Sequence, residues 1–352
     1  MPGSVRLYAG THEGLYVLRE GSGGWREEAV HLRGGIVDSI GGSLKRPERV
    51  YAGVAHDGVY RTVDAGRTWS KTLDGDVRSI AVDPGNDEVV YAGMEPTQLY
   101  RSDDGGRSWR EVTSLFDMPE EVRDNWWSPV SGVGHVRSIF VHDEDSNLLC
   151  LGLEHGGIIR SFDGGQSWDD VSGGIDYLDI HLVASVPGRF DRYFVSSARG
   201  FFTASEPAHG WTRAENGFTR DYFHDFVFLA PESEGQSPTM LIATADKSPG
   251  YWQRPEGVYS ARAAIFRSDD CAESWRRVAE AQPEPIDAMI STLIAHPVDA
   301  NSAFAGVGEV SRGHAHGEAG RGWVWITRDR GDTWRDLGVS LPADRVLWAA
   351  PA

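Results

Sequence analysis

An eight-residue pattern, T/S-x-D-x-G-x-T/S-W, recurs along this chain of 352 residues and constrains its fold more than any other feature. Four complete copies begin at Thr62, Ser102, Ser161 and Thr327. A fifth copy, from Ser268 to Trp275, has Ala272 where the others have glycine. A pattern that returns every 40 to 60 residues or so is typical of repeat architectures, in which each repeat is one supersecondary unit.

Each copy follows a β-rich run such as QLYRS or GIIRS, so we expect a hairpin turn between two strands. The aspartate can accept hydrogen bonds from backbone N–H groups of its own turn. The glycine allows a positive φ without steric cost, and the tryptophan has enough area to pack between neighbouring sheets. The repeat therefore predicts a stabilising turn rather than a site of chemistry.

This pattern is the one called the Asp-box or BNR repeat, and the chain resembles the Asp-box β-propellers. That superfamily includes sialidases, several other polysaccharide-cleaving enzymes and a photosystem II assembly factor. The resemblance implies a propeller fold, but it does not choose among these functions, because one fold can carry many of them.

Two degenerate copies, which end at Trp25 and Trp211, raise the number of predicted repeats to seven. We therefore expect an all-β, seven-bladed β-propeller that forms a single domain over 1–352. The run ADRVLWAAP near the C-terminus has the pattern of an inner strand, so we expect it to pair with the N-terminal blade and close the ring. The predicted blades are 343–352 with 1–30, 34–73, 76–116, 135–173, 177–216, 221–282 and 286–341.

The composition excludes several classes of partner. A formal net charge of −18 argues against a general binder of nucleic acid or of anionic membranes. The two cysteines, Cys150 and Cys271, provide no disulfide framework, and no run of apolar residues reaches transmembrane length. Because the first residues also lack an apolar leader, we expect a cytoplasmic protein.

Three long insertions are expected on the propeller face opposite the repeat turns. They span 116–134, 245–262 and 308–322, and long loops in a compact domain often carry function. We expect aromatic residues of these loops to stack on sugar rings, with Trp126, Trp127, Tyr251 and Trp252 as the candidates. Packing of the loops themselves is the alternative role of these rings.

Aligning the predicted inner strands on their shared ending gives one equivalent position per blade. From blade 1 to blade 7 these positions hold Arg345, Asp38, Arg78, Arg137, His181, Asp225 and Ser291. So polar a ring suits a small, charged or sugar-like ligand, and its arginines suit an anion. A water-filled channel whose charges neutralise one another is the alternative. The three arginines loosely resemble the sialidase triad, but no sialidase Arg-Ile-Pro motif is evident, so we do not expect a true sialidase.

The leading functional prediction is a propeller that binds an anionic or carbohydrate ligand, with glycoside hydrolase-like or lyase-like chemistry. Hydrolysis needs two carboxyl groups, and elimination needs a base such as histidine. The predicted catalytic residues are His181, Asp225, Asp38 and Glu154. The predicted ligand-binding residues are Arg78, Arg137, Arg345, Trp126, Trp127 and Trp252.

Two alternatives remain open from the sequence. Histidine and carboxylate together suit a divalent transition metal, so the chain could be a metal-dependent enzyme. Its predicted ligands would be His135, His181, His224, His155, His314 and His316. The other alternative is a non-catalytic assembly scaffold that binds a protein partner.

Overall fold

The computed structural model describes residues 4–129, 131–188, 191–233, 235–255, 257–279, 286–310, 320–342 and 344–352. Regular structure in these residues is almost entirely antiparallel β-sheet, which confirms the all-β prediction. The exceptions are one short helix, α1 (Glu120–Arg123), and three 3-10 turns, η1 (Thr113–Asp117), η2 (Pro207–His209) and η3 (Pro249–Tyr251). None of the helices in the described ranges has the length and apolar character needed to cross a membrane.

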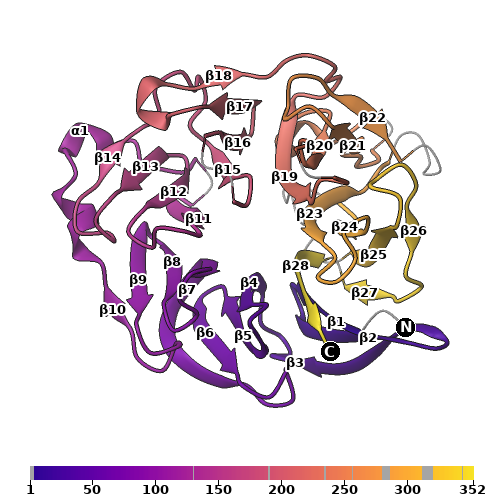
Figure 1. The fold of residues 1–352 in the computed structure, drawn as a ribbon. Coiled ribbons are helices and arrows are strands. Elements are labelled where there is room, and N and C mark those ends of the chain that lie inside the picture. Colours follow the sequence, from indigo (N-terminus) through magenta and orange to yellow (C-terminus); the bar gives the residue numbers. More distant parts are fainter. Residues whose placement is uncertain are drawn as a thin grey trace. The chain divides into compact units, whose positions relative to one another are not determined.

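The first of two compact units comprises Met1–Val37, Ala198–Gly200 and Ala214–Ala352. Its sheets have the strand orders β28-β1-β2-β3, β19-β20-β21-β22 and β23-β24-β25-β26, and β27 pairs with β25 (Figure 1). The strands are β1 (Val5–Thr11), β2 (Gly14–Gly21), β3 (Gly24–His31), β19 (Tyr222–Leu229), β20 (Thr239–Ala245), β21 (Ala264–Ser268), β22 (Arg276–Val278), β23 (Met289–Ala295), β24 (Ala303–Gly308), β25 (Arg321–Thr327), β26 (Arg335–Asp336), β27 (Leu341–Pro342) and β28 (Asp344–Pro351).

The second unit comprises Asp38–Ser197 and Phe201–Arg213. It contains a seven-stranded sheet with the order β10-β9-β8-β7-β6-β5-β4 and the sheets β11-β12-β13-β14 and β15-β16-β17-β18. The strands are β4 (Val37–Ser43), β5 (Arg46–Val54), β6 (Asp57–Thr62), β7 (Ser70–Val82), β8 (Val90–Glu95), β9 (Gln98–Ser102), β10 (Arg110–Glu111), β11 (His135–Val141), β12 (Leu149–Glu154), β13 (Gly157–Ser161), β14 (Asp169–Asp170), β15 (Ile180–Ser185), β16 (Tyr193–Ser197), β17 (Gly200–Ala204) and β18 (Thr212–Arg213).

The long strand β7 explains why the described strands form six sheets although seven blades were predicted. Its residues from Ser70 to Gly75 pair with β6, and those from Asp76 to Val82 pair with β8. The chain runs without a turn from one four-stranded meander into the next. Two meanders that the sequence predicts as separate blades therefore share β7 and become one continuous sheet.

The predicted pairing of the C-terminal strand with the N-terminal sheet is confirmed. Strand β28 lies antiparallel to β1, in a register that runs from Val5 opposite Pro351 to Gly10 opposite Val346. The N-terminal sheet thus receives its fourth strand from the other end of the chain.

The repeat turns make the hydrogen bonds predicted from their sequence. In the turn after β9, Asp104 Oδ1 accepts from the backbone N–H groups of Arg107 and Ser108, both at 2.9 Å. The Ser108 hydroxyl donates to Asp104 Oδ2 at 2.7 Å, and Ser102 Oγ accepts from Gly106 N–H at 2.8 Å. The hydrogen bond from the Ser108 hydroxyl, helped by those from the backbone, lowers the pKa of Asp104 below its usual range. The turn after β21 repeats this arrangement around Asp270.

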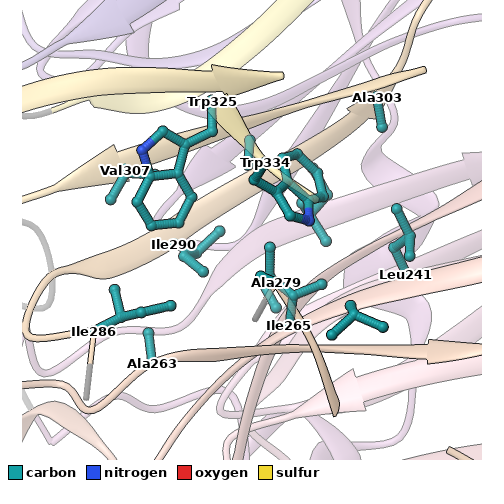
Figure 2. Close-up of a cluster of buried hydrophobic side chains, with 14 of the residues drawn as sticks. Leu241, Ala263, Ile265, Ala279, Ile286, Ile290, Ala303, Val307, Trp325 and Trp334 are labelled. Atoms are coloured by element: carbon teal, nitrogen blue, oxygen red, sulfur yellow. The ribbon is translucent and has the colours of Figure 1, made fainter. Parts of the chain in front are cut away.

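The tryptophan that ends a repeat packs where two sheets of the first unit meet. Trp334 is buried in one apolar cluster with Leu241 of β20, Ile265 of β21 and Ile290 of β23 (Figure 2). Its indole N–H donates to Gly331 O at 2.9 Å, so burial leaves no polar atom of the side chain unsatisfied. Trp334 therefore both ends the repeat turn and fills the core between the two sheets.

We predict that Gly106→Ala destabilises the fold by about 2 kcal/mol or more. Gly106 has φ +78°, and a Cβ there would lie 2.5 Å from Cε1 of Tyr51. The matched control is Ala272→Gly, because Ala272 occupies the equivalent position with φ +69°. Relief of strain and greater freedom of the unfolded chain oppose each other there, so the control should shift stability by less than about 1 kcal/mol. Urea unfolding of both variants measures the difference, and equal small shifts would contradict it.

Candidate functional site

Six of the seven residues aligned from the inner strands occupy a common structural position, a β-bulge in the strand that begins a four-stranded meander. The pairing register skips a residue at Arg78 in β7, at Arg137 in β11 and at His181 in β15. Bulges next to functional sites often re-aim a side chain, and these three lie in the second unit. The first unit repeats the irregularity in β19, β23 and β28, at Asp225, Ser291 and Arg345.

In the second unit, Arg78 holds three carboxylates together. Its guanidinium lies 2.7 Å from Asp38 Oδ2, 3.2 Å from Asp76 Oδ2 and 3.0 Å from Glu95 Oε2. Burial would lower the pKa of Arg78, but the three carboxylates outweigh it and raise the pKa further. Arg78 was predicted to bind a ligand anion, and the chain's own acidic side chains already surround it.

His135, the first residue of β11, bridges two further carboxylates. Its Nε2 lies 3.1 Å from Glu154 Oε2, and its Nδ1 lies 3.3 Å from Glu95 Oε2. Burial opposes the charged imidazolium, but the contacts with Glu154 and Glu95 outweigh burial and raise the pKa of His135. The two carboxylates therefore favour the protonated form of this buried side chain.

Glu154 ends β12 and is held as a carboxylate. Burial alone would raise its pKa, but the charge of Arg137 and the hydrogen bond from His135 outweigh burial and lower the pKa well below the usual range. Arg137 Nη1 lies 2.9 Å from Glu154 Oε2, the same oxygen that faces His135. Both contacts thus fall on one carboxylate oxygen.

Asp179 lies two residues before His181, and its pKa is raised, whereas that of Glu154 is lowered. His155 Nε2 lies 3.7 Å from its Oδ2, and His181 Nε2 lies 3.7 Å from its Oδ1. Both distances exceed those of a hydrogen bond, and the buried Oδ1 has no hydrogen-bond partner among the described residues. Burial, assisted by the charge of Glu154, raises the pKa of Asp179 to about 6.

The charged side chains around Arg78, His135 and Asp179 form one group, which we call the acidic cluster. Its balance of charges indicates which kind of ligand it can bind. The cluster contains the carboxyl groups of five residues, the guanidinium groups of Arg78 and Arg137, and the imidazoles of three histidines. Arg78 and Arg137 are both engaged with carboxylates of the chain itself. The arrangement suits a neutral polar ligand or a cation better than an anion. The acidic residues are Asp38, Asp76, Glu95, Glu154 and Asp179, and the histidines are His135, His155 and His181.

Other predicted site residues lie in the first unit. Asp225 Oδ1 accepts from Phe226 N–H at 2.9 Å, and its Oδ2 accepts from Leu293 N–H at 2.8 Å, which ties β19 to β23. His224 is buried, with its ring 6.1 Å from that of Tyr222. The backbone of Arg345 lies in β28, whereas His314 and His316 lie outside the described residues.

The predicted aromatic residues differ in exposure. Trp127 is 56% exposed, whereas its neighbour Trp126 is half-buried and packs on the core of the second unit. Trp252 is only 1% exposed, and its indole N–H donates to Lys247 O at 2.6 Å. Its expected place on a surface is therefore incorrect, because the loop 245–262 folds back and buries it. In that loop Tyr251 presents the exposed ring, 63% accessible.

Asp76 was not a predicted site residue, and the sequence indicated Glu95 only as one of several available carboxylates and Asp179 only as a neighbour of the predicted metal ligands. A signal for two of them is present, since three inner strands of the second unit carry a polar residue two positions before the bulge: D-V-R at 76–78, H-V-R at 135–137 and D-I-H at 179–181. Among the described residues, the group able to offer a metal three ligand atoms within 4.8 Å of one another is Glu154, His155 and Asp179. It shares only His155 with the predicted metal ligands.

No protein-family model matches this chain. A curated relative, the oligoxyloglucan-reducing end-specific xyloglucanase of Emericella nidulans, is 26% identical over 233 residues, 63% of this chain and 26% of the relative. The match thus spans about a quarter of the length of that relative.

Matches to solved structures cover a larger share of the chain than the match to the curated relative. The GH74 xyloglucanase from Xanthomonas campestris superposes with a TM-score of 0.65 at 18% identity, over 96% of this chain and 52% of that one. YCF48 bound to a D1 peptide superposes with a TM-score of 0.54 at 18% identity, over 86% of this chain and 80% of that one. These likenesses show the fold, an all-β arrangement of propeller type.

Proposed function

We propose that the acidic cluster of the second unit binds a neutral saccharide and cleaves a glycosidic bond. The observation that carries the proposal is the pair Glu154 and Asp179, which offer carboxylate oxygens within 4.8 Å of each other. Glycoside hydrolysis needs two carboxyl groups across the scissile bond, one as proton donor and one as carboxylate. The sequence relation to a xyloglucanase supports a saccharide as the substrate class.

The environments of the two groups support different roles. Asp179 has a raised pKa and a buried oxygen without a hydrogen-bond partner, which suits a general acid. Glu154 stays ionised, and the contacts that the described residues Arg137 and His135 make with it at 2.9 and 3.1 Å fall on Oε2, so we assign Oε1 to the anomeric carbon. His181, 3.7 Å from Asp179, would position the acid.

The chemistry then follows in two steps. Asp179 donates its proton to the glycosidic oxygen as the bond to the anomeric carbon breaks, and Glu154 Oε1 bonds to that carbon. Water next attacks the same carbon, Asp179 accepts its proton, and Glu154 leaves as a carboxylate. A separation of less than 4.8 Å between the offered oxygens suits the class of enzymes that act through a covalent intermediate, in which the two carboxyl groups lie close together.

We further propose that the chain forms seven blades arranged in a closed ring. Each of the seven four-stranded meanders would be one blade, with β7 shared by two of them and β28 completing the N-terminal one. In that arrangement the bulge residues Arg78, Arg137 and His181 would face the axis, as would Asp38.

Incubation with a panel of oligosaccharides tests the proposed function. Xyloglucan oligosaccharides are the first substrates, because the curated relative is named for them, and sialosides serve as the contrasting anionic set. Release of new reducing ends from the neutral set, and none from the sialosides, is the expected result. Cleavage confined to anionic substrates would contradict the charge argument.

A further inference from the structure

Glu154, His155 and Asp179 bring one imidazole nitrogen and two carboxylate oxygens to a single point of the second unit. Each residue can offer an atom that lies within 4.8 Å of those of the other two. His155 follows Glu154 directly in the turn after β12, and Asp179 directly precedes β15. A mixed nitrogen and oxygen set of this kind suits Zn²⁺, Mn²⁺, Fe²⁺ or Co²⁺.

The distance between His155 and Asp179 fits a shared ion better than it fits a direct contact. His155 Nε2 and Asp179 Oδ2 are 3.7 Å apart, which is too long for a hydrogen bond. Two ligand atoms that each lie about 2.1 Å from a tetrahedral ion are about 3.4 Å from one another. The gap between these side chains is therefore close to the separation that a shared ion imposes.

The charges at this point leave room for a further cation. The contacts that Glu154 makes with Arg137 and His135 both fall on Oε2. No guanidinium or ammonium group contacts Asp179 within ion-pair distance among the described residues, and its Oδ1 has no hydrogen-bond partner there. An ion placed between Glu154 Oε1, His155 and Asp179 would compensate two adjacent carboxylates at once.

We propose that Glu154, His155 and Asp179 bind a divalent transition-metal ion, and that this ion blocks glycoside cleavage. The ion and a saccharide compete for the same carboxyl pair, since a carboxylate that coordinates an ion can neither donate a proton nor attack carbon. Binding of the ion stands apart from the proposed function, whereas its inhibitory effect rests on that function. His155 and Asp179 are 18% and 13% exposed, so an ion can reach them from solvent.

The chain contains a matched control in a second turn. His56 occupies the same place after β5 as His155 does after β12, with φ +59° against +53°. Its Nδ1 lies only 2.6 Å from Asp76 Oδ2, so this pair is already closed. Within the described residues His56 belongs to no three-ligand group.

The test is titration of chelator-treated protein with Co²⁺, followed by its visible absorption, and with Zn²⁺, followed by calorimetry. We expect about one ion per chain, with an absorption band typical of Co²⁺ in a four- or five-coordinate site. His155→Gln and Asp179→Asn should each weaken binding at least about tenfold, while His56→Gln leaves it unchanged. Thermal melts confirm that each variant is folded.

The outcomes separate the two parts of the proposal. Absence of stoichiometric binding, or equal affinity of His155→Gln and the parent protein, would overturn the ion site. Zn²⁺ should also suppress saccharide cleavage at the concentration at which it binds, compared with each variant's own ion-free rate. Full cleavage at saturating Zn²⁺ would overturn the competition. Ion binding without any saccharide cleavage would leave the ion site supported and the proposed function refuted.

Discussion

Asp179→Asn should reduce kcat for cleavage of an unactivated oligosaccharide by roughly a hundred- to ten-thousandfold, because it removes the proposed general acid. Asparagine has nearly the same shape, but it cannot give a proton to the glycosidic oxygen. Steady-state kinetics on the substrate found in the oligosaccharide panel measure the effect. A KM close to that of the parent protein is expected, since the side chain still fills the site.

A control and a second readout distinguish acid catalysis from a structural defect. Asp176→Asn makes the same change three residues upstream, where Asp176 is 67% exposed and pairs with Arg213. Its activity should be unaffected. Aryl glycosides whose leaving groups need no proton should be cleaved by Asp179→Asn with a much smaller loss. An equal loss on both kinds of substrate would argue against the acid role.

The same variant should remain folded. Burial raises the pKa of Asp179 to about 6, above the value of 3.8 for an unperturbed aspartate. A group whose pKa is raised on folding favours the folded state below the unfolded value, and this contribution is lost as the pH rises through about 6. At neutral pH the ionised carboxylate of the ion-free protein therefore opposes folding. Asparagine removes that cost, so its thermal midpoint should equal or exceed that of the parent.

Arg78→Met should destabilise the protein by about 3 to 5 kcal/mol, because it leaves three carboxylates without their shared cation. Asp38, Asp76 and Glu95 all lie within 3.2 Å of this guanidinium, and its side chain is only 18% exposed. Methionine keeps the length of the side chain but not the charge. Urea unfolding followed by tryptophan fluorescence measures the change.

Arg213→Met is the matched control for this prediction. Arg213 forms a surface pair with Asp176 and lies in the same unit. Exposed ion pairs contribute about 1 kcal/mol or less, so the control should change little. If the two variants lost similar stability, Arg78 could not be the centre of a buried charge network.

The repeat turns were the most predictable part of the structure, because every partner in them is local. Asp104 binds backbone groups three and four residues further along, so the sequence spacing already contains the geometry. The pairing of β28 with β1 could be predicted as well, since a blade that begins at its second strand needs a first strand from elsewhere. The alignment of the inner strands correctly grouped Arg78, Arg137 and His181 as equivalent residues. It did not predict that each of them lies at a β-bulge.

The contacts of the candidate site could not be predicted in the same way. Whether Arg78 faces a ligand or Asp38 depends on side-chain distances across neighbouring strands, which spacing does not encode. The raised pKa of Asp179 results from its burial beside Glu154, which belongs to another sheet. Trp252 was misplaced because an insertion can fold back on its own unit and bury an aromatic that its sequence places in a loop.

The central claim is that a saccharide binds between Glu154 and Asp179. A crystal structure of Asp179→Asn soaked with an oligosaccharide tests it most directly, since the variant should bind without turning over. The predicted result is a sugar ring with its anomeric carbon beside Glu154 Oε1 and its glycosidic oxygen beside the side chain of residue 179. A saccharide bound only elsewhere, with this pair open to solvent, would contradict it.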